Sequence, residues 1–261
     1  MKKIFKQFKK SQLYKSIFRR SYKSTPRNRA LAIFGNVFLH LHPVKIRESA
    51  VKYKFTWGMG GITFLLFIIL TLTGILLMFY YHPSVEKAYW DVKDLEYQVP
   101  FGLFLRNLHR WAAHLMVITV MIHMFRVFMT GSYKSPRQFN WVIGVILLVL
   151  TFLLSFTGYL LPWDQLGFWA ITVGTNMGGA TPFIGYEGPF SAALGINIYN
   201  DVRFFLIGGT TVGENALLRS YIWHCVGIPL VAIVLMFVHF WRIRKDGGIS
   251  GPEITVKKNH N

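Results

Sequence analysis

The stretch that decides the fold is FLRNLHRWAAHLMVITVMIHMFRVFMT, residues 104–130, in which His109 and His123 stand fourteen residues apart in an apolar segment. A helical rise of about 1.5 Å per residue separates the two rings by about 21 Å, with a net rotation of roughly 40°. Both imidazoles therefore lie on one face of a membrane-length helix, at two different depths.

A second apolar segment, Ser220 to Trp241, carries His224 and His239 fifteen residues apart. The same helix geometry predicts about 22 Å and roughly 60° of rotation, so this pair also shares a face. If the two helices lie side by side and parallel, His109 meets His224 at one level and His123 meets His239 at the other. Two imidazoles on one iron porphyrin leave no open coordination position, which is typical of an electron-transfer haem.

Each histidine has a simpler interpretation as a hydrogen-bonded core residue. This alternative weakens inside a bilayer, where ionisable groups are costly and usually have a functional partner. Four rings matched in height favour two stacked metal sites.

The composition indicates a membrane protein, with 52% hydrophobic and 15% charged residues in 261. A span needs about 20 apolar residues, and the sequence offers four such runs. We predict an all-α membrane protein, a bundle of four transmembrane helices that holds two b haems. The predicted spans cover about residues 55–81, 104–130, 139–163 and 220–241.

The charge asymmetry predicts the orientation. With four spans, both termini and the 131–138 loop share one side of the membrane. That side carries 23 basic and three acidic residues, and the other side carries six basic and eight acidic residues. The positive-inside rule places that side in the cytoplasm or its equivalent. The net charge of +18 is explained by anionic lipid headgroups, and no nucleic-acid recognition motif accompanies it.

Three regions follow: a basic segment 1–54, the transmembrane domain 55–242 with its outer-face loop 162–219, and a cytoplasmic-side tail 243–261. The N-terminal segment lacks the continuous apolar run of a cleavable signal peptide. Apolar residues at near-helical spacing between Ile4 and Phe18 predict an amphipathic helix on the membrane surface, with a disordered basic tail as the alternative. The one cysteine, Cys225, excludes an internal disulfide and a C-x-x-C-H haem attachment.

The first and third spans carry glycines at matching intervals. Gly60 and Gly74 are fourteen residues apart, as are Gly144 and Gly158, and the interval equals that between His109 and His123. Glycine inside a helix usually marks the close approach of another body to the backbone. We interpret these glycines as room for two flat macrocycles. Small-residue helix packing is the alternative.

Arginines flank the histidines, and a guanidinium binds a carboxylate with two hydrogen bonds. Arg106 and Arg110 are placed to bind the propionates of an outer haem and Arg126 those of an inner one, with Arg219 a weaker candidate at the outer level. Anchoring at the membrane interface is the alternative for each.

The long connection after the third span begins Pro162-Trp163-Asp164-Gln165, which predicts a turn into a helix along the outer surface. Loops of this length are usually functional. We expect an outer quinol site near Pro162, Trp163, Asp164 and Phe168. An ordinary interfacial aromatic belt is the alternative.

Several strings resemble cytochrome b of the quinol-oxidising bc complexes, across about residues 55–252. They are Arg106-Asn-Leu-His-Arg-Trp, His123-Met-Phe-Arg, Gly131-Ser-Tyr-Lys-Ser-Pro-Arg, Thr157-Gly-Tyr-Leu-Leu-Pro-Trp-Asp-Gln and Ile243-Arg-Lys-Asp-Gly-Gly-Ile-Ser-Gly-Pro. Ending after four spans and spacing its last histidines by fifteen, the chain looks most like the short b6 form. In that form a separate subunit supplies the remaining helices.

The resemblance implies two haem b groups and a mechanism. Quinol is oxidised near the outer face, one electron passes to a Rieske iron–sulfur protein, and the other crosses the two haems to a quinone near the inner face. Protons are released outside and taken up inside. The family's haem contacts correspond to Gly60, Gly74, Gly144 and Gly158, and its propionate arginines to Arg110 and Arg126.

The resemblance also implies a c-type cytochrome partner, a dimeric complex and a bacterial inner membrane or an equivalent energy-transducing membrane. Two departures from the family pattern matter. The short form commonly attaches an extra c-type haem through a cysteine where this chain has Gly58, so that covalent haem is not expected. The Pro-Glu-Trp-Tyr loop of the outer quinol site is absent and should belong to the partner subunit.

For the inner quinone site, His40, His42 and Arg242 are the candidates.

Two other classes of protein remain open at this stage. A dihaem membrane anchor of a hydrogenase or formate dehydrogenase also uses four spans but lacks the Leu-Leu-Pro-Trp-Asp-Gln and Gly-Ser-Tyr strings. A transporter or scaffold without haem would be colourless.

Overall fold

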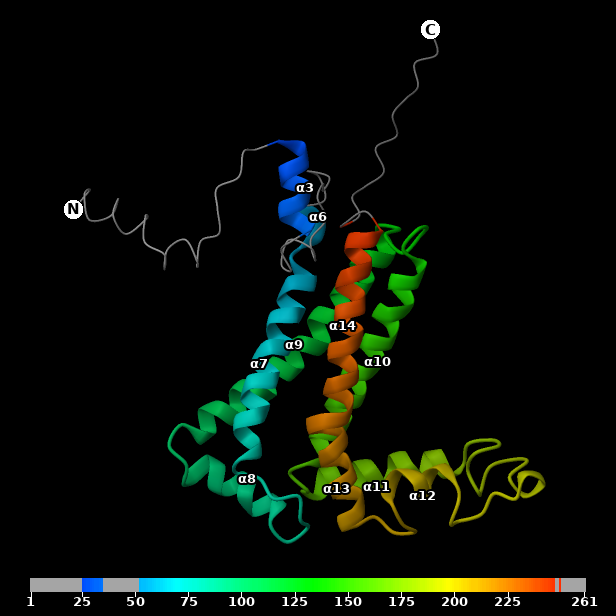
Figure 1. Cartoon of the computed structure of the whole chain (residues 1–261). Coiled ribbons are helices and arrows are strands. Elements are labelled where there is room, and N and C mark those ends of the chain that lie inside the picture. Colours follow the sequence, from blue (N-terminus) through cyan, green and yellow to red (C-terminus); the bar gives the residue numbers. More distant parts are fainter. Residues whose placement is uncertain (1–24, 35–51, 247–248, 250–261) are drawn as a thin grey trace.

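The computed structural model describes residues 25–34, 52–246 and 249, and its regular elements in these ranges are all helical (Figure 1). Nine lie in the order α3 (Pro26–Phe34), α6 (Tyr53–Thr56), α7 (Met59–Met78), α8 (Ala88–Tyr97), α9 (Gly102–Met129), α10 (Gln138–Leu160), α11 (Gln165–Gly179), η1 (Ala192–Leu194) and α12 (Val202–Ile207). The last three, α13 (Glu214–Ile222), the π-helix η2 (Trp223–Gly227) and α14 (Ile228–Lys245), form one continuous helix.

Four helices are long and apolar enough to cross a membrane: α7, α9, α10 and the continuous helix Glu214–Lys245. The predicted all-α class with four spans is confirmed. Their apolar side chains remain largely uncovered by protein, as Leu72 and Val234 illustrate with 60% and 61% exposure. Such surfaces are expected where lipid supplies the apolar surroundings.

The spans form two packed pairs. In Figure 1, α7 runs beside α9, and α14 runs beside α10. The histidines lie on α9 and on the continuous helix Glu214–Lys245, and these two helices pack chiefly against α7 and α10 rather than against each other. The histidine helices therefore face one another across the middle of the bundle without close backbone contact.

The two ends of the bundle differ in chemistry. We call the end that holds Met59, Met129, Gln138 and Lys245 the basic end, and the opposite end the loop end. At the loop end the long connection folds into α11, η1 and α12, and Figure 1 shows α11 and α12 lying across the spans. The predicted helix after Pro162 is confirmed as α11. The predicted surface helix before Phe18, and His40 and His42, lie outside the described residues.

Side-chain caps explain where the two loop-end helices begin. Asp164 accepts a hydrogen bond from the Gly167 amide at 2.8 Å, and Asp201 accepts one from the Phe204 amide at 2.7 Å. Each carboxylate satisfies an amide that has no partner inside the first turn. Beneath them, Leu160, Ile171, Ile207 and Ala216 form a small buried cluster that joins the connection to α10 and α13.

The corner between α8 and α9 depends on the absence of a side chain at Gly102. A Cβ there would collide with the Leu95 carbonyl oxygen and would lie 3.0 Å from the Cβ of Val99. The carbonyl is backbone and cannot rotate away. Gly102→Ala should therefore destabilise the protein by about 1–3 kcal/mol, the usual cost of overpacking. Thermal unfolding of the purified protein measures this.

Gly61→Ala is the matched control, because a Cβ at this helical position meets nothing within 4 Å. It should leave stability unchanged or raise it by up to about 1 kcal/mol. Equal unfolding temperatures for the two variants would contradict this account of the corner.

Candidate functional site

The structure brings His109 and His224 together near the loop end. Their ring centroids are 6.2 Å apart, and the rings are inclined at 70°. Metal–imidazole bonds are about 2.0–2.1 Å long, so two rings on opposite sides of one metal ion have centroids roughly 6 Å apart. The observed separation therefore suits two ligands of one metal ion.

Hydrogen bonds determine the tautomer of His224. Its Nδ1 lies 3.1 Å from the Leu154 carbonyl oxygen, which can only accept, so Nδ1 carries the proton. The Thr157 hydroxyl, 3.3 Å from the same nitrogen, donates its own proton to Leu153. Nε2 is left with its lone pair, as a metal ligand requires.

His109 is held in the same way from the opposite side. The Thr73 hydroxyl donates to the Ile69 carbonyl at 2.7 Å, so its oxygen accepts from His109 Nδ1 at 2.8 Å. This pairing again leaves Nε2 as the free acceptor. Both loop-end imidazoles are thus oriented by partners on the neighbouring helices α7 and α10.

The second pair lies toward the basic end, where His123 on α9 and His239 on α14 occupy corresponding positions. Each faces a glycine of the first or third span, as described below. Nδ1 of His239 is buried and makes no hydrogen bond of standard geometry to a described residue, although the Asn140 backbone lies near this ring. The basic-end pair therefore lacks the threonine support found at the loop end.

Each of the four glycines lies against one of the four histidines. A Cβ built on Gly74 would lie 3.3 Å from Cε1 of His109, and one on Gly158 only 2.5 Å from Cε1 of His224. At the basic end the corresponding distances are 3.2 Å from Gly60 to His123 and 3.8 Å from Gly144 to His239, and Met124 Sδ lies nearer to Gly144 at 3.5 Å. These contacts place the glycines in the same two levels as the histidine pairs.

The sequence prediction for the fourth span needs one correction. The helix begins at Glu214, ends at Lys245, and is not regular, because Trp223–Gly227 is π-helical. A π-turn accommodates one extra residue within an α-helix. By ideal helix geometry the fifteen-residue spacing of His224 and His239 then acts as a spacing of fourteen. This gives a rotation of roughly 40°, as on α9, instead of the predicted 60°.

The arginines divide into paired and available groups. Arg126 is buried, donates from Nε to the Phe55 carbonyl at 3.0 Å, and stacks 4.1 Å from the centre of the Phe55 ring. Its Nη2 is buried without a partner among the described residues. A buried guanidinium nitrogen without an acceptor is suited to a carboxylate at the basic end.

The other arginines predicted to bind propionates or quinone differ from Arg126 in their partners. Arg106 forms an ion pair with Glu96 of α8, and Arg219 donates to the Phe205 carbonyl, so both already have protein partners. Arg110 is exposed at the loop end. Arg242, the candidate at the inner quinone site, forms an ion pair with Asp246 at 2.9 Å.

The predicted quinol-site residues gather where α10 ends and α11 begins. Trp163 and Phe168 meet edge to face with their centroids 6.0 Å apart. Pro162 is partly buried in the turn, and Asp164 is engaged as the cap of α11. The aromatic pair and the turn thus form one local unit at the end of α10, the helix that contacts the ring of His224.

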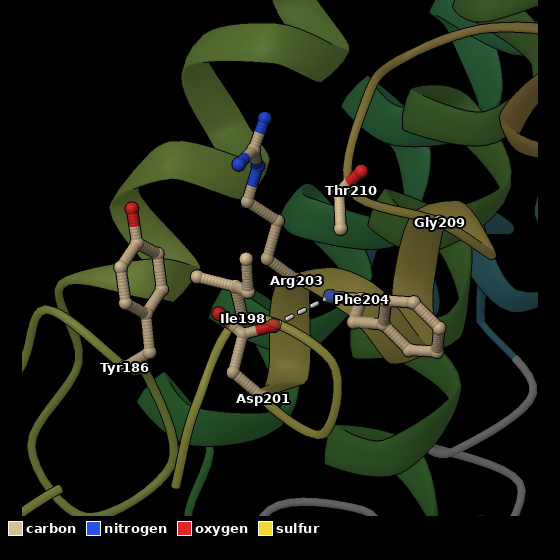
Figure 2. A pocket seen from close by; sticks show the side chains of 7 residues that line it. All are labelled: Tyr186, Ile198, Asp201, Arg203, Phe204, Gly209 and Thr210. Atoms are coloured by element: carbon tan, nitrogen blue, oxygen red, sulfur yellow. Dashed lines mark hydrogen bonds between the residues drawn. The ribbon is translucent and has the colours of Figure 1, made fainter.

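A separate pocket of about 210 Å³ lies farther out in the connection (Figure 2). Asp201 and Arg203 line it, and Asp201 Oδ2 and Arg203 Nε are buried without partners among the described residues. None of its lining residues belongs to the predicted quinol site. The sequence analysis did not single out this pocket.

Within the described residues, no group of three or more His, Cys, Asp or Glu side chains converges on one point. The histidine pairs thus offer two protein ligands each, which suits an iron whose remaining ligands come from a porphyrin. The side-chain-free backbone at the four glycines, the free Nε2 atoms and the unpartnered Nη2 of Arg126 also fit this group.

These features define a membrane-spanning protein with two paired-histidine sites, one near each end of a four-helix bundle. A sequence model described as "Cytochrome b/b6/petB" matches residues 45–247. The chain belongs to this cytochrome b family, whose members bind haem b.

Individual relatives agree with this assignment. Cytochrome b6 of Porphyra purpurea is 42% identical over 194 residues, covering 74% of this chain and 83% of the relative. Cytochrome b6 of Euglena gracilis is similar to the same extent. Among solved structures, a chain of "Hyperthermophilic respiratory Complex III" is similar, with a TM-score of 0.71 and 27% identity over 90% of this chain.

This chain spans 57% of the length of that complex III chain. The comparisons do not favour the hydrogenase or formate dehydrogenase anchor that the sequence analysis kept open.

Two features of the site escaped the sequence analysis. Thr73 and Thr157 each directly precede a glycine that faces a loop-end histidine, and this repeated Thr-Gly pair was a visible signal. The π-turn had no such signal beyond the fifteen-residue spacing itself.

Gly158→Ala should disturb the loop-end site far more than Gly144→Ala disturbs the basic-end site. The new methyl group would lie 2.5 Å from the His224 ring, which its hydrogen bonds hold in place, but 3.8 Å from His239. We expect Gly158→Ala to lose about half of the haem absorbance of the purified protein, and Gly144→Ala to lose less. The opposite order would contradict the geometry.

Deleting Val226 should convert the π-turn to α-helix and preserve the relative orientation of His224 and His239. Deleting Val234, another exposed valine between the two histidines but outside the π-turn, should rotate His239 by about 100° against His224. Haem content per chain is the measurement. Equal loss of haem in both deletion variants would show that the π-turn does not absorb the extra residue.

Proposed function

We propose that this chain is the electron-carrying cytochrome b subunit of a bc-type complex. It conducts electrons across the membrane from a quinol oxidised at the loop end to a quinone reduced at the basic end. Proton release on one side and proton uptake on the other accompany this transfer. The observation that carries the proposal is the pairing of His109 with His224 at a ring separation of 6.2 Å.

Two haem b groups would be held by histidines from α9 and from the continuous helix Glu214–Lys245, with His109 and His224 at one level and His123 and His239 at the other. Haem b held by two imidazoles would supply a one-electron carrier. The two levels are about 21 Å apart along the helices, so each lies near one surface of the membrane.

The protein's own groups make these positions specific. Thr73, Thr157 and the Leu154 carbonyl orient the loop-end imidazoles and keep each Nε2 unprotonated. The glycines Gly60, Gly74, Gly144 and Gly158 let the rings approach the helix backbones. Arg126 would bind a propionate at the basic end, because its free Nη2 is buried there. Arg110 would do so at the loop end, while Arg106 is already paired with Glu96.

The turn Leu161–Asp164 and the Trp163–Phe168 pair would bind the quinol ring at the loop end. Aromatic rings and a partly buried turn offer an apolar surface for a quinone head group. The chain has no Pro-Glu-Trp-Tyr string, so a partner subunit would complete this site.

The basic end would face the cytoplasm or its equivalent in an energy-transducing membrane, such as a bacterial inner membrane. The asymmetry of 23 basic residues against six supports this orientation. Quinol is then oxidised at the outer face. The family assignment supports further partners: a Rieske iron–sulfur protein, a c-type cytochrome and a second copy of the complex. Gly58 stands where a covalent haem attachment would need cysteine, so no such haem is proposed.

Replacing one histidine should remove one haem and leave the other. His224→Leu should abolish the redox transition of the loop-end site, and His239→Leu that of the basic-end site, because each loses one of two iron ligands. Each variant should retain about half of the low-spin b-type absorbance. Potentiometric titration of the purified complex measures both effects.

His114→Leu is the matched control. This histidine lies on α9 between His109 and His123 but is exposed and contacts Trp111 rather than a second histidine. It should keep both transitions. Two intact transitions in His224→Leu would refute the bis-histidine assignment.

A further inference from the structure

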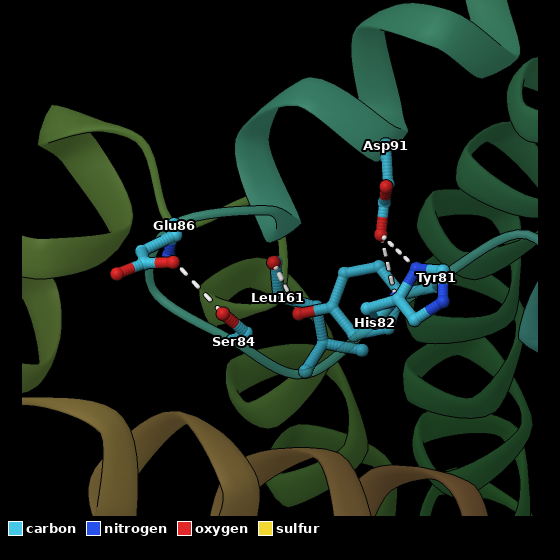
Figure 3. Close-up of polar contacts among 6 residues, drawn as sticks. All are labelled: Tyr81, His82, Ser84, Glu86, Asp91 and Leu161. Carbon is cyan, nitrogen blue, oxygen red and sulfur yellow. Dashed lines mark hydrogen bonds and ion pairs between the residues drawn. The ribbon is translucent and has the colours of Figure 1, made fainter.

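Tyr81 connects the two halves of the bundle at the loop end (Figure 3). It follows α7, and its hydroxyl donates a hydrogen bond to the Leu161 carbonyl oxygen at 2.6 Å. Its ring stacks on Tyr221 of α13, with centroids 5.4 Å apart and planes inclined at 27°. One side chain therefore joins the α7 side of the bundle to both α10 and the fourth span.

The backbone that carries Tyr81 is itself anchored. The next residue, His82, donates from its backbone amide to Asp91 Oδ2 at 2.6 Å, and its Nδ1 lies 2.9 Å from the same oxygen (Figure 3). Asp91 belongs to α8. The phenol is thus held in place from the α8 side, so its hydroxyl reaches Leu161 from a fixed position.

The acceptor is the residue that leads into the proposed quinol site. Leu161 caps the end of α10, where the last carbonyls of a helix lack intrahelical partners. Two residues later, Trp163 adopts a left-handed backbone conformation with φ of 48°, which is strained for a bulky residue. Strained residues persist only where the surrounding structure holds them, and they cluster at functional sites.

The strained turn is held from both sides. The Tyr81 hydroxyl binds Leu161 before Trp163, and the Asp164 carboxylate binds the Gly167 amide after it. Burial raises the pKa of Tyr81, with smaller contributions from the nearby Cys225, Asp91 and Tyr221. The phenol therefore stays protonated and acts as a donor, not as a base.

We infer that Tyr81 is a positioning residue for quinol oxidation: its hydroxyl holds the Leu161 carbonyl and thereby sets the place of the Trp163 ring. This inference rests on the proposed function of the Leu161–Asp164 turn. Tyr81 does not touch the reacting atoms in this account. Its effect reaches the quinol through the backbone of the turn.

The test is Tyr81→Phe in the complete complex, which removes the hydroxyl and keeps the ring stacked on Tyr221. The substrate is a reduced short-chain ubiquinone or menaquinone, whichever the wild-type complex oxidises. We expect the KM for this quinol to rise at least threefold, with both haem spectra and the unfolding temperature retained. Tyr80→Phe is the matched control, because Tyr80 is half-exposed and no side-chain hydrogen bond joins it to the described residues.

An unchanged KM, a fall in kcat alone, or loss of a haem in Tyr81→Phe would overturn the positioning role. If the Tyr81 hydrogen bond only stabilised the fold, Tyr81→Phe would lower the unfolding temperature and leave the KM unchanged. That result would also overturn the positioning role. A raised KM in Tyr80→Phe as well would show that the effect is not specific to the Leu161 hydrogen bond.

The variant Trp163→Ala distinguishes a failure of the Tyr81 inference from a failure of the proposed quinol site. If Trp163→Ala impairs quinol oxidation while Tyr81→Phe does not, only the role of Tyr81 is wrong. If Trp163→Ala oxidises the same quinol with wild-type kinetics, the proposed quinol site is wrong, and the role of Tyr81 falls with it.

Discussion

The architecture depends on four places where an imidazole lies against a helix backbone that has no side chain. Between Gly158 and His224 the room is so small that even a methyl group would reach within 2.5 Å of the ring. A large residue at any of these positions would push the ring out of the interior and away from its counterpart. The glycines lie on α7 and α10, and the histidines lie on α9 and the fourth span Glu214–Lys245. These contacts therefore set the spacing within both helix pairs at two levels.

Polar groups inside a bilayer are tolerated when they have partners, and the two levels meet this demand differently. At the loop end each imidazole donates to a neighbouring helix, through Thr73 or through Leu154 and Thr157. At the basic end, Nδ1 of His239 and Nη2 of Arg126 make no hydrogen bond of standard geometry to a described residue. The proposed cofactor offers carboxylates that Arg126 can bind. Both levels thus have a glycine facing each imidazole, and they differ in their hydrogen bonding.

Much of this arrangement was predictable because it follows from local periodicity. The interval between His109 and His123 defines a helix face, and the equal interval between Gly60 and Gly74 indicates what faces it. The four spans follow from runs of uncharged residues in the same way. Features that arise between distant segments were not predictable. The Arg106–Glu96 ion pair joins α9 to α8, and the π-turn at Trp223–Gly227 interrupts the regular helix of the fourth span. The hydrogen bond from Tyr81 to Leu161 crosses eighty residues of sequence and has no local signature.

The proposed function requires that each chain holds two irons, each between two imidazoles. Low-temperature electron paramagnetic resonance and near-infrared magnetic circular dichroism of the oxidised, purified complex, together with haem content per chain, test it most directly. We expect two low-spin haems per chain, both with the charge-transfer band of bis-imidazole ligation. A single haem per chain, or a haem with methionine, thiolate or open axial ligation at either level, would contradict it.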